Sequence, residues 1–225
     1  AAAAESVSGE VTYDGASSFQ ALVEAAAEKF MDANPDVSVS GSGNGSGKGL
    51  TAVAAGTVTI GNSDVFAETK LEADQVKNLV DHEVAVVGMG PVVSKNVKVD
   101  DLSLEQLKGI FSGQITNWKE VGGEDLDIIP FQRNSEAGSQ TLMEKLVMDG
   151  LEMMDAPEAW VPDSMMGLLE AVREYDNSPS AIGYTVYYYA NDMEMAKGLK
   201  VLTIDGVSPS AEAIQAGEYP FLNPY

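Results

Sequence analysis

The chain of 225 residues is long enough for one large domain or two small ones. Its 35 acidic and 13 basic residues give a formal net charge of −22, which argues against nucleic acids and anionic membrane surfaces as partners. The absence of cysteine excludes disulfides and thiolate chemistry, and a single histidine leaves no ligand set for a transition metal. No apolar run is long enough to span a membrane. The alanine-rich start lacks the segments of an intact signal peptide, and we interpret it as a tether left after processing or as a cloning remnant.

Strand and helix patterns alternate along the first half of the chain. Residues 10–15 predict a strand, and Ser17 or Ser18 is expected to cap a helix whose apolar residues recur at helical spacing from Phe19 to Phe30. The other elements expected here are a strand over 37–41, a short helix over 50–56 that begins near Ser46 and Gly47, a strand over 57–61, an amphipathic helix over 71–80 and a buried strand over 83–93.

The second half repeats this alternation. Ser103 and Gln106 form a predicted capping box at the start of a helix over 102–113. The elements expected after it are a strand over 127–133, a helix over 137–150, strands over 180–188 and 199–205, and a short helix over 210–217. Alternating strands and helices predict an α/β architecture with mixed, largely parallel sheets.

Three loops share one design, with small and hydroxyl-bearing residues at the start of a predicted helix: residues 14–19, 43–49 and 136–141. A helix N-terminus exposes unpaired backbone N–H groups and a partial positive charge, and small residues let an anion approach it closely. Ordinary helix capping explains any one of these loops. Three of them after predicted strands favour an anion site at the carboxyl ends of the sheet.

The second of these loops also suggests a nucleotide-binding P-loop, but its spacing excludes one. Gly43 and Gly47 are one residue too close together, and Gly49 stands where the P-loop requires serine or threonine. Lys48 is expected to be exposed to solvent.

Two charged residues complete the predicted anion site. Arg133 is expected to end a strand, where its fork of donors would suit a tetrahedral oxyanion. Asp64 follows another strand, and as a carboxylate it can only accept a hydrogen bond. An aspartate in an anion site therefore favours an anion that carries a proton, such as monohydrogen or dihydrogen phosphate. Sulfate has no proton to offer at neutral pH. The alternatives are a surface arginine at position 133 and a helix N-cap or turn aspartate at position 64.

Six segments, "DGASSF", "GNGSGKGL", "GNSD", "IFSGQITNWKEVGG", "FQRNSEAGSQT" and "SAIGYTVYYYA", occur in the order that is typical of the phosphate-binding proteins of phosphate ABC transporters. The chain resembles that family over nearly its whole length. The resemblance implies a two-domain periplasmic-binding-protein fold of type II with a ligand cleft between the domains. It implies a first α/β lobe over 1–86, a second over 87–218, and a return crossover that begins at 219–225.

The resemblance also implies which residues bind inorganic phosphate. They are Ser18, Phe19 through its amide, Ser46, Asp64, Arg133, Ser139, Gln140 through its backbone, and Thr141. The interval from Arg133 to Gly138 is longer than in the commonest family pattern, and Ala137 stands where a serine is usual.

Family members usually continue beyond the position of Tyr225 and return to the first lobe. Three explanations stay open: a truncated form, elements supplied by another chain, or a reduced first lobe.

We expect an extracytoplasmic solute-binding protein without enzymatic activity, cofactor or metal. It would act as a monomer at the cell surface or in the periplasm, with a lipid anchor possible in its precursor, and would deliver phosphate to an ABC transporter permease. One alternative is the same fold used as a truncated sensor or scaffold with weak or no phosphate binding. A phosphate-handling enzyme is the other, and the lone His82 and the lack of a general base disfavour it.

Overall fold

The structure, a computed structural model, describes residues 7–175, 178–191 and 197–224. The chain forms two compact units. The first comprises the residues up to Asp81 together with Glu136–Gly138, and the second comprises His82–Ser135 and the residues from Ser139 on.

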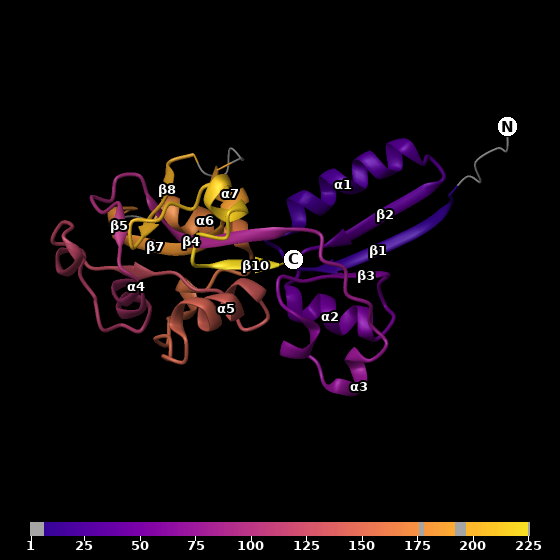
Figure 1. Cartoon of the computed structure of the whole chain (residues 1–225), viewed down its shortest axis with the longest axis horizontal. Coiled ribbons are helices and arrows are strands. Elements are labelled where there is room, and N and C mark those ends of the chain that lie inside the picture. The colour runs from indigo at the N-terminus through magenta and orange to yellow at the C-terminus, as the bar shows by residue number, and fades with distance from the viewer. Residues whose placement is uncertain (1–6, 176–177, 192–196, 225) are drawn as a thin grey trace. The chain divides into compact units, whose positions relative to one another are not determined.

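The first unit is a small parallel sheet with helices packed on it (Figure 1). Its elements are β1 Gly9–Gly15, α1 Gln20–Ala33, β2 Val37–Ser42, α2 Ser46–Ala54, β3 Ile60–Asn62, a 3-10 turn over Ala67–Thr69, and α3 Ala73–Val76. β1 lies in the middle and pairs in parallel with both β2 and β3. All three strands therefore end at the same edge of the sheet.

Gly49 lets α2 pack closely on β1. A Cβ atom at Gly49 would lie 2.4 Å from the Cα atom of Gly15, which no real side chain tolerates. A P-loop has a serine or threonine at the place of Gly49, whereas in this chain the residue at that place has to be small so that α2 can pack on β1. Lys48, the preceding residue, is exposed as expected.

The predicted first helix forms, but none of its residues is buried. Leu22 and Phe30, two members of its apolar stripe, are 41% and 45% exposed. The spacing of apolar residues predicted the helix correctly, whereas their burial depends on what packs against the stripe.

The second unit is built around the long strand β4. Its strands are β4 Val86–Ser94, β5 Asp101–Leu102, β6 Ile129–Pro130, β7 Ala181–Val186, β8 Leu199–Val201, β9 Thr203–Ile204 and β10 Leu222–Pro224. β4 pairs antiparallel with β7, β8 and β10, while β6 adds to β7 in parallel. This sheet is mixed, and β5 and β9 form a separate parallel pair. The α/β class predicted from the sequence is confirmed.

Helices cover this sheet and bury its apolar side chains. They are α4 Leu104–Phe111, α5 Gly138–Leu142, a π-helical turn over Met143–Met148, α6 Met165–Glu174, α7 Tyr187–Asn191 and α8 Ala211–Gln215, with short 3-10 turns over Trp118–Val121, Glu158–Trp160 and Ser178–Ser180. Every residue of β7 is buried. The predicted capping box of α4 is present: the Gln106 amide donates to Ser103 Oγ at 3.1 Å, and the Ser103 amide donates to Gln106 Oε1 at 2.9 Å.

Two predicted elements are much shorter than expected. The helix predicted over 71–80 is reduced to α3, because none of those ten residues is buried and a short helix without a packed face is marginal. The strand predicted over 127–133 ends at Pro130. Beyond it, the amide of Gln132 donates to the Trp160 carbonyl instead of to a strand, so Arg133 lies past the strand rather than at its end.

The strand predicted over 180–188 was also too long. β7 ends at Val186, and the next residues begin the helix α7.

Candidate functional site

Three polar side chains follow the three parallel strands of the first unit. Ser18 comes after β1, Ser46 begins α2 directly after β2, and Asp64 comes after β3. The strand ends are neighbours in the sheet, since Asp14 pairs with Ser42 and Gly15 with Asn62. In open α/β sheets this edge is where ligands bind.

Asp64 is the centre of this group. It is 1% exposed, and Ser18 Oγ donates to its Oδ2 at 3.0 Å while Ser46 Oγ donates to its Oδ1. The Asp64 amide in turn donates to Ser46 Oγ at 3.3 Å. Both serines are themselves buried. A buried charge is costly unless it is hydrogen-bonded, and these two hydroxyls satisfy that need.

The expectation that Ser17 or Ser18 caps the first helix was wrong. Phe19 occupies the N-cap position of α1, and no side chain caps the helix. The Ser18 hydroxyl donates to Asp64, far away in the sequence, because the adjoining strand ends bring the two together. The Phe19 amide, predicted to face the ligand, donates to the Ala16 carbonyl at 3.1 Å.

Residues 136–138 belong to the first unit and lie against the same group. The Gly47 amide, in the first turn of α2, donates to the Glu136 carbonyl at 3.1 Å. A Cβ atom at Gly138 would lie 1.2 Å from Asp64 Oδ1 and 2.5 Å from Ser46 Oγ. Only glycine fits there, and its small size brings the backbone directly against the carboxylate.

In the second unit, Arg133 is held with its guanidinium buried. It is 4% exposed, its Nε donates to the Pro162 carbonyl at 3.1 Å, and an Nη donates to the Asp163 carbonyl at 3.0 Å. Two backbone carbonyls therefore fix the plane of the guanidinium group, which presents five donors in a rigid fork.

The other predicted ligand residues of the second unit lie in α5. Ser139 and Gln140 are buried, and Thr141 is half-buried. The Gln140 side chain turns inward: its Oε1 accepts the Arg133 amide at 3.1 Å and its Nε2 donates to Glu144 Oε1 at 3.0 Å. These contacts engage the Gln140 side chain within the protein, and the role predicted for its backbone stays a prediction.

Sequence analysis missed Tyr184, whose buried hydroxyl accepts the Arg133 amide at 2.8 Å and donates to Gln140 Oε1. The sequence indicated Tyr184 only as a member of the segment 180–190, one of the six segments that carry the family resemblance. The contact joins residues 51 positions apart, which no local pattern reveals.

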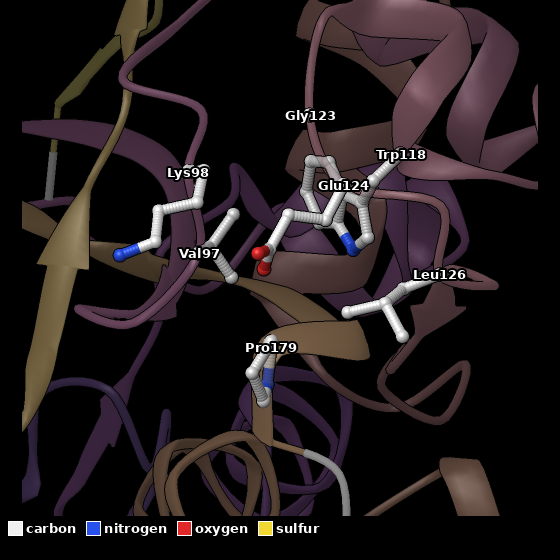
Figure 2. Close-up of a pocket in the computed structure, with 7 residues that line it drawn as sticks. All are labelled: Val97, Lys98, Trp118, Gly123, Glu124, Leu126 and Pro179. Carbon is white, nitrogen blue, oxygen red and sulfur yellow. The ribbon is translucent and has the colours of Figure 1, made fainter.

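Two cavities of the second unit contribute little to an anion site. None of the predicted ligand residues lines the small pocket in Figure 2. Its lining residues are Val97, Lys98, Trp118, Gly123, Glu124, Leu126 and Pro179. A larger cavity of about 490 Å³ includes Gln140, but its lining carries the acidic residues Glu144, Glu152 and Asp155. An anion would be repelled there.

Within the described ranges, no helix is both long and apolar enough to cross a membrane. The same part of the chain has no group of three or more histidine, cysteine or acidic side chains that could hold a metal ion.

A family model and the curated relatives identify the family of this chain. The family model of the PBP superfamily domain matches residues 1–225. The phosphate-binding protein PstS of Bacillus subtilis is 43% identical over 216 residues, which are 96% of this chain and 68% of that protein. The chain belongs to the PstS family of phosphate-binding proteins.

Solved structures of this family share the fold. A putative phosphate ABC transporter substrate-binding protein from Clostridium perfringens, solved with bound phosphate, matches with a TM-score of 0.84 and 28% identity, over 96% of this chain and 84% of that chain. An ABC-type phosphate transport receptor from Vibrio cholerae matches with a TM-score of 0.70 and 26% identity, over 95% and 84%. The family resemblance and the periplasmic-binding-protein fold expected from the sequence are confirmed.

In this PstS family member, each unit brings its predicted residues together separately. Ser18, Ser46 and Asp64 are in mutual contact in the first unit. Arg133 and Gln140 are in contact in the second. Their roles toward a ligand stay predictions.

Proposed function

We propose that this chain is an extracytoplasmic solute-binding protein that captures inorganic phosphate for an ABC transporter. The observation that carries the proposal is the buried Asp64 carboxylate with the two serine hydroxyls at the ends of three parallel strands. The names of the relatives support the same ligand.

Asp64 would select the protonated form of the anion. Each serine hydroxyl has a single proton, which in this structure is directed at Asp64. To donate to a phosphate oxygen, Ser18 or Ser46 has to rotate away from the carboxylate. The proton of monohydrogen or dihydrogen phosphate then replaces the lost donor on Asp64. Sulfate brings no such proton, so the exchange would leave two negative charges facing each other.

The predicted ligand residues of the second unit supply positive charge, through Arg133. Arg133, with Ser139, Thr141 and the backbone of Gln140, would bind the remaining phosphate oxygens. The Phe19 amide would add a donor from the first lobe once it leaves the Ala16 carbonyl, to which it donates in this structure. The carbonyl contacts of Arg133 support this role, because a pre-oriented guanidinium loses less freedom on binding. In this proposal each of the lobes 1–86 and 87–218 supplies part of the set of donors. The segment from residue 219 begins the return to the first lobe.

The partners follow from the family. Its members are phosphate-binding transport proteins rather than enzymes. The permease of an ABC transporter is the proposed recipient of the phosphate, and the proposed location is the periplasm or the outer cell surface, with a lipid anchor in the precursor. We further propose that the protein acts as a monomer.

Titration calorimetry with phosphate and with sulfate tests the proposal directly. We expect saturable phosphate binding with one site per chain and no sulfate heat under the same conditions. Thermal unfolding measured in parallel should shift upward with phosphate, because a ligand that binds only the folded state stabilises it. Absence of both the heat and the shift would refute phosphate capture by this chain.

A further inference from the structure

A buried hydrogen-bond network in the second unit connects Tyr184 to two of the predicted ligand residues. Tyr184 lies in β7, is 1% exposed, and accepts the backbone N–H of Arg133 at 2.8 Å. Its own proton goes to Gln140 Oε1, which also accepts the Arg133 amide at 3.1 Å. One phenol thus contacts both ends of the loop that joins Arg133 to α5.

The network fixes the orientation of the Gln140 side chain. Its oxygen faces Tyr184 and Arg133, and its nitrogen donates to Glu144 Oε1 at 3.0 Å. Because α5 begins at Gly138, the position of Gln140 also sets the position of the neighbouring Ser139 and Thr141. The backbone amides and hydroxyls of that turn are the predicted phosphate donors.

Packing holds the Tyr184 ring in place. Phe111 of α4 contacts it edge to face, with ring centroids 5.7 Å apart and an interplanar angle of 66°. Burial raises the pKa of the Tyr184 phenol above its usual range, so the hydroxyl keeps its proton and remains a donor to Gln140. Packing and hydrogen bonds therefore fix the position of the Tyr184 side chain.

We infer that Tyr184 is a positioning residue for phosphate binding: it does not touch the anion, and its hydroxyl holds Arg133 and the start of α5 in the geometry that binds it. The inference rests on the proposed function and adds a residue of the buried sheet to its machinery. A displacement of the binding groups by even a fraction of an ångström weakens the binding of the anion, because several hydrogen bonds lose their geometry together.

The test is Tyr184→Phe, with Tyr219→Phe as the matched control. Both substitutions delete one buried phenol oxygen from the second unit, and Tyr219 is 2% exposed. Within the described residues the Tyr219 hydroxyl has no hydrogen-bond partner, so its removal breaks no network. Phosphate dissociation constants from calorimetry should rise about tenfold for Tyr184→Phe and stay within about twofold for Tyr219→Phe.

A double-mutant cycle separates positioning from a general loss of stability. Gln140→Met keeps the size of the side chain and removes the acceptor for the Tyr184 proton. If Tyr184 acts through this network, adding Tyr184→Phe to Gln140→Met should weaken phosphate binding much less than Tyr184→Phe does alone. Fully additive effects on the dissociation constant would overturn the inference.

The outcomes distinguish this inference from the proposed function. If the unsubstituted chain binds no phosphate, both fail. If it binds phosphate and Tyr184→Phe binds equally well, the inference alone fails. Should Tyr184→Phe not fold, Gln140→Met tests the same contact from its other end, and an unchanged dissociation constant for that variant would also overturn the positioning role.

Discussion

Replacing Asp64 with asparagine keeps the shape of the side chain and changes what its two terminal atoms can do. In the structure both carboxylate oxygens accept a serine hydroxyl, Ser18 on one and Ser46 on the other, in a site that is 1% exposed. Asparagine offers one accepting oxygen and one donating NH2 group. One of the two acceptor positions is therefore converted into a donor.

The size of the effect follows from that conversion. A hydrogen bond to a charged group contributes about 1.5–3 kcal/mol, which corresponds to about a tenfold to hundredfold change in a binding constant. Phosphate loses the charged acceptor for its proton, because the oxygen that asparagine retains is neutral, so its affinity should fall by about this factor. For sulfate, the Asp64→Asn substitution removes a repelling charge and adds a donating NH2 group, so its affinity should rise. The phosphate-to-sulfate ratio should fall by at least about tenfold.

Calorimetry with both anions at one pH and ionic strength measures this ratio. Asp32→Asn is the matched control, because Asp32 is exposed on α1 of the same unit and its substitution removes the same charge from the overall field. The control should leave the ratio within about twofold of the original chain, since exposed charges are screened. An Asp64→Asn variant with unchanged selectivity would refute the assignment of Asp64 as the acceptor of the phosphate proton.

Three further substitutions separate binding from stability. Arg133→Lys keeps the charge but loses the fork held by two backbone carbonyls, and calorimetry should show phosphate affinity lower by about tenfold or more; an equal affinity would mean that charge alone suffices. Gly138→Ala places a Cβ atom 1.2 Å from Asp64 Oδ1, so we expect loss of measurable phosphate binding. Intact binding would contradict the close approach of the Gly138 backbone to the Asp64 carboxylate. Ser103→Ala removes the cap of α4, which accepts the Gln106 amide, and denaturant unfolding should show a loss of about 1 kcal/mol while the phosphate dissociation constant stays the same. A change in that dissociation constant would show that the cap influences the site.

Local patterns in the sequence predicted most of the secondary structure. The helix spacing from Phe19 to Phe30 and the capping box of Ser103 each correspond to an element of the structure. These signals are local, because a helix face and a helix cap are defined by residues a few positions apart. The predictions failed where the pattern needed support from elsewhere in the fold. None of residues 71–80 is buried, and the Gln132 amide donates to the Trp160 carbonyl instead of extending the pairing with β7.

The order of motifs determined the family, and the residue types at the strand ends predicted the kind of ligand. The sequence alone placed a serine or an aspartate after each of three strands and an arginine before a glycine- and serine-rich helix start. Comparison with the PstS family confirmed the family and the fold. The individual ligand roles stay predictions.

Only the tertiary structure decided which partners these side chains have. Ser18 is a donor to Asp64 instead of a helix cap, because parallel pairing of β1 and β3 brings their ends together. Gly138 is required by the approach of its backbone to Asp64, and Tyr184 supports Arg133 from a strand far along the chain. Hydrogen bonds and close contacts of this kind join residues that are distant in sequence. They depend on the packing of the whole unit, which no short segment encodes.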